Sequence, residues 1–92
     1  MFSFSPTSIY KKSYQKIIQK NPVLEKRINK TLGLMAKNPY HPSLKTHKVI
    51  TKNKKVAQSS WVAPDLRIIW QFDNDIIQVI DLFDIGNHDE VY

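Results

Sequence analysis

The sequence predicts an α+β domain, in which an N-terminal strand and a helical hairpin pack on a twisted antiparallel sheet of about four strands. The first 40 residues place apolar side chains at helical spacing, whereas most of the remainder forms strand-length runs rich in β-branched and aromatic residues. The connections between these runs are too short for a crossover, which favours antiparallel neighbours. With 92 residues, of which 41% are hydrophobic, the chain is expected to form a single domain over residues 1–92 with a modest core.

Two amphipathic helices are predicted before residue 40. Apolar residues form one stripe in each helix, comprising Ile9, Tyr10, Tyr14, Ile17 and Ile18 in the first and Leu24, Ile28, Leu32 and Met35 in the second. Ser5 is suited to cap the first helix, and Pro6 is suited to its first turn. Asn21 and Pro22 end this helix and begin the next, with Asn21 as a possible cap, so the two helices should form a hairpin.

The remaining runs are predicted to be strands. They cover residues 45–50, 57–63, 66–72 and 76–83, and residues 1–4 could add an edge strand. In the run 66–72, alternation directs one set of side chains toward the helices, namely Leu66, Ile68, Trp70 and Phe72. Arg67, Ile69 and Gln71 then face the other way, on a surface left partly open for a ligand. Trp61 is assigned to the core, as is Trp70.

Charge is distributed unevenly along the chain. Residues 1–60 contain thirteen Lys or Arg and one acidic residue, whereas residues 61–92 contain one Arg and seven acidic residues. The basic part suggests a polyanionic partner such as RNA or DNA, with a lysine-rich solvated helix surface as the alternative.

Composition also excludes some classes of protein. There is no cysteine, so neither a disulfide framework nor a Cys-based zinc site is available, and a reducing cytosol fits. The N-terminus lacks the pattern of a secretory signal, and no apolar run reaches the 18 residues of a membrane span. We expect a soluble, cytoplasmic protein with no membrane partner.

The C-terminal stretch Asp84–Tyr92 is unusual for a chain end. Gly86 and Asn87 are suited to a turn, and His88, two carboxylates and Tyr92 follow within five residues. A tail that frays into solvent is usually small and polar. The cluster therefore suggests a functional role.

Four motifs together resemble the RelE/ParE superfamily of type II toxins and, within it, the YafQ-like branch. In chain order after a helical hairpin, they are Asn38-Pro39, His41–Lys48 (HPSLKTHK), Pro64–Trp70 (PDLRIIW) and Asp84–Tyr92 (DIGNHDEVY). The resemblance spans nearly the whole chain and implies a RelE-like fold. Asn87 replaces the small residue that usually precedes the histidine, and Trp70 stands where Tyr or Phe is common.

The resemblance implies the toxin of a type II toxin-antitoxin system that inhibits translation as a ribosome-dependent mRNA endonuclease, without a metal or other cofactor. A ribose 2′-OH would attack the adjacent phosphate, giving a 2′,3′-cyclic phosphate and a 5′-OH. The implied partners are a cognate antitoxin, mRNA in the ribosomal A site and rRNA. Operator DNA would be bound only through the antitoxin complex.

The same resemblance implies the catalytic residues. His88 corresponds to the C-terminal catalytic histidine of the YafQ-like branch, Asp65 to the aspartate that follows proline, and Arg67 to the strand arginine of the wider family. His47 matches a possible active-site histidine on an earlier strand, and Tyr92 sits where many members have a functional aromatic. Structural alternatives are an ion pair for Arg67, turn capping for Asp65 and a hydrogen bond to a nearby aspartate for His88.

Five lysines are candidates for RNA binding, with a solvated loop as the alternative: Lys45, Lys48, Lys52, Lys54 and Lys55. The three histidines lack the spacing of a zinc site. Two other functions remain open: a ParE-like toxin that poisons DNA gyrase without nuclease activity, and a non-catalytic nucleic-acid-binding module. A third alternative is a decayed toxin that persists only as an antitoxin partner. Members of the ParE-like branch generally lack the terminal histidine, so His88 favours the nuclease.

Overall fold

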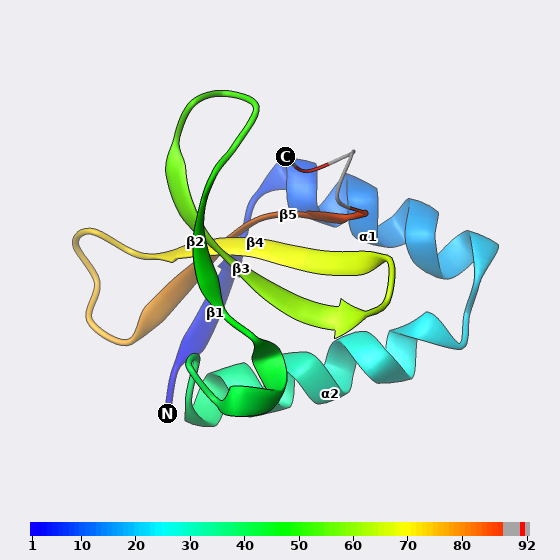
Figure 1. Cartoon of the computed structure of the whole chain (residues 1–92), viewed down its shortest axis with the longest axis horizontal. Coiled ribbons are helices and arrows are strands. Elements are labelled where there is room, and N and C mark those ends of the chain that lie inside the picture. The colour runs from blue at the N-terminus through cyan, green and yellow to red at the C-terminus, as the bar shows by residue number, and fades with distance from the viewer. Residues whose placement is uncertain (88–90, 92) are drawn as a thin grey trace.

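The computed structural model describes residues 1–87 and residue 91 (Figure 1). In chain order, its elements are β1 (Ser3–Pro6), α1 (Ser8–Lys20), α2 (Leu24–Lys37), a 3-10 turn η1 (Pro42–Leu44), β2 (His47–Ile50), β3 (Val56–Ala63), β4 (Leu66–Phe72) and β5 (Val79–Gly86). The predicted α+β class and helical hairpin are confirmed. Among the described residues, no helix is long and apolar enough to cross a membrane.

The sheet is mixed, which corrects the prediction of an antiparallel sheet of about four strands. Within the described part of the chain, five strands lie in the order β1-β5-β4-β3-β2. Strands β2 to β5 pair antiparallel, as their short connections require, but β1 pairs parallel with β5. The connection rule applies only to strands that follow one another, and β1 and β5 lie at opposite ends of the chain.

Both helices cover one face of the sheet and bury the main core there. Ile28 and Met35 from α2 and Ile68 and Trp70 from β4 are all fully buried in it. Tyr10 joins them from α1 at 5% exposure. The predicted orientation of Leu66, Ile68 and Trp70 toward the helices is therefore confirmed, and Phe72 packs against the same core while remaining partly exposed. The Trp70 Nε1–H donates to the Ser60 hydroxyl (2.8 Å), which satisfies the one polar atom of that buried ring.

The helix ends differ from the predicted caps. Thr7, rather than Ser5, caps α1: its hydroxyl oxygen accepts from the Tyr10 amide (3.2 Å) and its O–H donates to the Phe83 carbonyl (2.9 Å). Pro6 belongs to β1 instead of the first helical turn. Asn21 is the C-cap of α1, and α2 begins after Val23 with no side-chain cap. Thr7 thereby ties the start of α1 to β5.

The predicted strand 76–83 begins later, because a turn occupies its first residues. The Asp73 carboxylate accepts from the amides of Asp75 (2.9 Å) and Ile76 (2.9 Å), and Gln78 has a left-handed φ of 61°. Ile77 is left 89% exposed. These local hydrogen bonds compete with strand pairing, so β5 starts at Val79.

Candidate functional site

The sheet face opposite the helices carries a second, smaller apolar cluster. Ala57, Ile69 and Val91 are buried in it, and Val49 and Phe83 pack against it. Val91 is 4% exposed, and its amide donates to the Asn87 carbonyl (3.2 Å). The face predicted to be partly open is therefore partly covered, and Val91 of the C-terminal stretch packs on it. We call this surface the open face.

Strand register places Arg67 beside the start of the C-terminal stretch. Arg67 lies opposite Trp61 on β3 and opposite Gly86 on β5. Directly opposite residues of antiparallel strands project their side chains to the same face. The predicted site residues His88 and Tyr92 lie outside the described residues. Gly86 is two positions before His88 in the sequence, so Arg67 pairs with the strand residue that leads into the stretch containing His88.

The Arg67 guanidinium is held by the β3–β4 turn and forms no ion pair with Asp65 or Asp81. Its Nη1 donates to three backbone carbonyls, those of Ala63 (2.8 Å), Leu66 (3.1 Å) and Pro64 (3.3 Å). A guanidinium carries five N–H donors in a rigid fork. Three carbonyls on one nitrogen fix its orientation, and the Nε and Nη2 donors have no protein acceptor within the described part of the chain. An arginine fixed in this way is suited to hold a phosphate.

His47 lies on the same face, one row away from Arg67. It pairs with Ser59, which pairs in turn with Ile69. The exposed His47 ring has its Nδ1 3.0 Å from the Lys45 carbonyl. A carbonyl can only accept, so Nδ1 carries the hydrogen and, in the neutral ring, Nε2 is the basic nitrogen. This tautomer can take up a proton at Nε2.

Trp61 is a correction to the predicted core. It is half-buried, and its position opposite Arg67 puts it on the open face. The Lys45 ammonium lies 5.5 Å from the centroid of the Trp61 ring, within the range of a cation–π contact. The signal was available in the alternation of β3, because Ala57, Ser59 and Trp61 share a face, but using it required the β3–β4 register.

Asp65 occupies an exposed position in the turn that joins β3 to β4, two residues before Arg67. It therefore lies at the same end of the sheet as Arg67 and Trp61. The structure thus brings together Asp65, Arg67 and Trp61, with His47 and Lys45 on β2 and the segment before it.

The five candidate lysines do not form one patch. Lys48 lies between His47 and Val49 on β2, so alternation directs it to the opposite face. Lys54 is exposed in the β2–β3 loop, with a left-handed φ of 59°. Lys52 and Lys55 instead line a pocket. Only Lys45 lies beside the Arg67 row.

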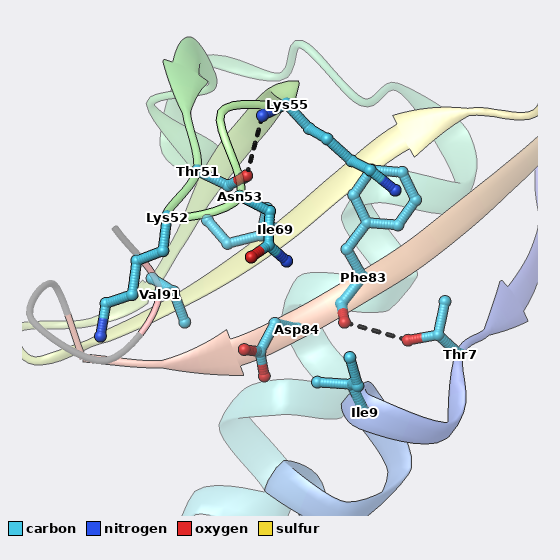
Figure 2. A pocket seen from close by; sticks show the side chains of 10 residues that line it. All are labelled: Thr7, Ile9, Thr51, Lys52, Asn53, Lys55, Ile69, Phe83, Asp84 and Val91. Carbon is cyan, nitrogen blue, oxygen red and sulfur yellow. Dashed lines mark hydrogen bonds between the residues drawn. The ribbon is translucent and has the colours of Figure 1, made fainter.

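This pocket, about 340 Å³ in volume, opens on the same face of the sheet, under the β2–β3 loop (Figure 2). Its lining residues are Thr7, Ile9, Thr51, Lys52, Asn53, Lys55, Ile69, Phe83, Asp84 and Val91. Sequence reasoning had singled out only Lys52 and Lys55 among these residues, because the lining comes from five separate segments of the chain. We call it the loop pocket.

Metal ligation has no clear location in the described part of the chain. No group of three or more His, Asp or Glu side chains there is close enough to hold an ion.

Several solved toxin structures share this fold. A metal-bound toxin from Helicobacter pylori is 22% identical with a TM-score of 0.79, and the match covers 100% of both chains. YafQ from E. coli is 16% identical with a TM-score of 0.74, covering 98% of this chain and 97% of that one. YafQ in the E. coli DinJ–YafQ complex is 18% identical with a TM-score of 0.68 and the same coverage. No protein-family model and no curated protein sequence matches the chain. The RelE-like fold expected from the sequence is confirmed.

Proposed function

We propose that the chain is the toxin of a type II toxin-antitoxin system and inhibits translation by cutting mRNA on the ribosome. The observation that carries the proposal is the pairing of Arg67 with Gly86. It puts the single cation of β4 beside the segment whose motif contains His88. The fold shared with YafQ over nearly the whole chain supports the same conclusion.

The proposed reaction is an internal transesterification of RNA. The ribose 2′-oxygen forms a bond to the adjacent phosphorus, and the bond from phosphorus to the 5′-oxygen breaks. A base removes the 2′-OH proton, an acid protonates the departing 5′-oxygen, and a cation stabilises the charge of the phosphorane. The products are a 2′,3′-cyclic phosphate and a 5′-OH.

The residues divide these tasks. Arg67 holds the phosphate, with its guanidinium oriented by the turn carbonyls. His88 serves one proton transfer, and His47, whose Nε2 is the basic nitrogen, is the candidate for the other. Asp65 lies at the same end of the site, and Tyr92 is assigned to stacking on a base. No step requires a metal ion or other cofactor.

Partners follow from the proposed role. DinJ and YafQ form a complex in the E. coli structure, and we assign this chain a cognate antitoxin of its own, through which operator DNA is bound. The other partners are mRNA in the ribosomal A site and rRNA, whose phosphates we assign to the five candidate lysines, Lys45, Lys48, Lys52, Lys54 and Lys55. The protein would act in the cytoplasm.

Inducible expression of wild type and His88→Gln, followed by primer extension on an abundant transcript, tests the proposal. Growth arrest and new mRNA 5′ ends are both expected from wild type. Neither is expected from His88→Gln. His41→Gln is the matched control, because the His41 side chain accepts a hydrogen bond from the Ser43 amide (3.1 Å) at the start of η1, and this variant should cleave as wild type does. Arrest without new 5′ ends would contradict the nuclease and favour a gyrase poison.

A further inference from the structure

The loop pocket adjoins the proposed cleavage site without being part of it. Ile69 and Val91 belong both to its lining and to the apolar cluster of the open face. Ile69 is two residues along β4 from Arg67, a separation of roughly 7 Å on a strand. An RNA strand held at Arg67 therefore reaches this pocket within one or two nucleotides.

The pocket has an apolar floor and a polar rim. Ile69, Phe83 and Val91 supply the floor, with Phe83 offering a flat aromatic ring, while Lys52 and Lys55 reach along the rim from the β2–β3 loop (Figure 2). A volume of about 340 Å³ falls within the usual range for small-ligand sites. Aromatic floors with cationic rims suit nucleotides, because the base stacks while the phosphate meets the cations.

Both walls of the pocket are held in place by hydrogen bonds. In the loop, Thr51 Oγ1 accepts from the Lys55 amide (3.2 Å), and the Thr51 amide donates to the Lys55 carbonyl (2.9 Å). In the opposite wall, the Thr7 hydroxyl donates to the Phe83 carbonyl (2.9 Å). The pocket is therefore preformed, which lowers the entropic cost of binding.

Asp84 decides which kind of ligand fits. Its Oδ1 accepts from the Ser13 hydroxyl (2.7 Å) and the Ile85 amide (2.8 Å), which fixes the carboxylate at the pocket wall. An acidic peptide side chain would be repelled by this carboxylate. The exocyclic amino group of a nucleobase could instead donate to Oδ2.

We infer that the loop pocket binds one base of the RNA strand next to the scissile bond, with Lys52 and Lys55 on its flanking phosphate. The inference rests on the proposed function for the identity of the strand. It assigns base selection to Phe83, Asn53 and Asp84. Uracil has no exocyclic amino group, so adenine and cytosine should bind more tightly than uracil.

Amide NMR of the full-length ¹⁵N-labelled His88→Gln protein tests the inference, because this variant is not expected to be toxic and can be produced in cells. AMP, CMP, UMP, inorganic phosphate and a short glutamate-rich peptide are each titrated. AMP and CMP should shift the amides of Asn53, Lys55 and Phe83 with higher affinity than UMP, and phosphate alone should leave Phe83 unmoved. Equal shifts from phosphate, no shifts with AMP, or tighter binding of the peptide would overturn the base pocket.

Charge variants separate this pocket from general attraction. Lys52→Gln/Lys55→Gln should weaken AMP binding by about tenfold, since two exposed ionic contacts are lost. Lys26→Gln/Lys37→Gln removes the same charge from exposed positions on α2 and should change the affinity less than twofold. Equal weakening in both double variants would contradict a specific site.

Cleavage mapping in cells keeps the two proposals distinguishable. If wild type cleaves mRNA and the Asp84→Asn variant, which keeps the Oδ1 acceptor but loses the second carboxylate oxygen, has the same base preference around each cut, the base pocket is wrong and the nuclease stands. If AMP binds in the loop pocket but wild type cuts no mRNA, the nucleotide site stands and the nuclease is wrong.

Discussion

The two faces of the sheet differ in what covers them, although the same strands build both. On β4, Ile68 and Trp70 are fully buried under the helices. Their neighbours Arg67 and Ile69 face the other way, where the apolar cluster is small and opens into the loop pocket. Alternate residues of β4 thus have different roles: one set packs in the main core, and the other set lies at the candidate site. Substitutions on the helix face should therefore mainly lower the stability of the fold, whereas substitutions on the open face should mainly lower activity.

The largest expected effect compares two adjacent isoleucines. Ile68→Ala should lower the free energy of unfolding by about 4 kcal/mol, because it leaves a sealed cavity in the main core. Ile69→Ala should cost only about 2 kcal/mol, since it enlarges a pocket that is already open. Urea unfolding of both variants measures the difference. Equal losses would show that the two clusters are equally closed.

Arg67→Gln should separate activity from stability. Loss of the cation that holds the phosphorane is expected to reduce mRNA cleavage by about 100-fold. The free energy of unfolding should fall by about 1 kcal/mol, from the lost hydrogen bonds to the turn. Arg27→Gln, at an exposed position on α2, is the matched control in the same cleavage and unfolding assays. A stable Arg67→Gln protein that cleaves normally would remove Arg67 from the site.

Tyr10→Phe tests whether the buried hydroxyl of Tyr10 lowers the stability of the main core. The Tyr10 hydroxyl is buried and finds no partner among the described residues, so its removal should raise the free energy of unfolding by about 1 kcal/mol. Burial raises the pKa of Tyr10 above its ordinary value of 10.0, with the nearby Tyr14 adding to the shift.

The raised pKa gives the same residue a pH signature. The buried phenol stays protonated where an unfolded one would ionise, so wild-type stability should fall as pH rises above about 10. Tyr10→Phe should lose less stability over that range. Parallel pH profiles for wild type and Tyr10→Phe would contradict the burial argument.

Lys45→Gln should have the smallest effect. The contact between Lys45 and Trp61 is partly exposed, and such cation–π pairs contribute about 0.5–1 kcal/mol. We expect a loss of that size in urea unfolding. Lys11→Gln, exposed on α1, serves as the control and should lie within error of wild type.

Local patterns predicted much of the fold. Strand β4 was predicted with its observed bounds, and the two helices followed from their apolar stripes. Parallel pairing of β1 with β5 could not be predicted, because no local signal says which distant strand an edge strand joins. Ile76 and Ile77 have strand propensity, but the Asp73 carboxylate holds the backbone there in a turn.

For the candidate site, alternation along a strand predicted the face of some residues, whereas their arrangement depended on strand register and tertiary contacts. Arg67 was placed correctly on the face opposite the helices from alternation alone. Trp61 was placed wrongly, because its direction depends on register with β4. The five lysines looked like one patch in sequence, yet Lys48 faces away from His47. The loop pocket combines segments as distant as Thr7 and Val91, which only the folded chain brings together.

The central claim is that the open face promotes attack by an RNA 2′-OH. The most direct measurement uses purified ribosomes programmed with an mRNA whose cut position has been mapped, and a second mRNA with a single 2′-deoxynucleotide on the 5′ side of that cut. Wild-type protein should cleave the first mRNA to leave a 2′,3′-cyclic phosphate and should leave the second intact at that position. Continued cleavage of the 2′-deoxy mRNA at the same bond would contradict the account.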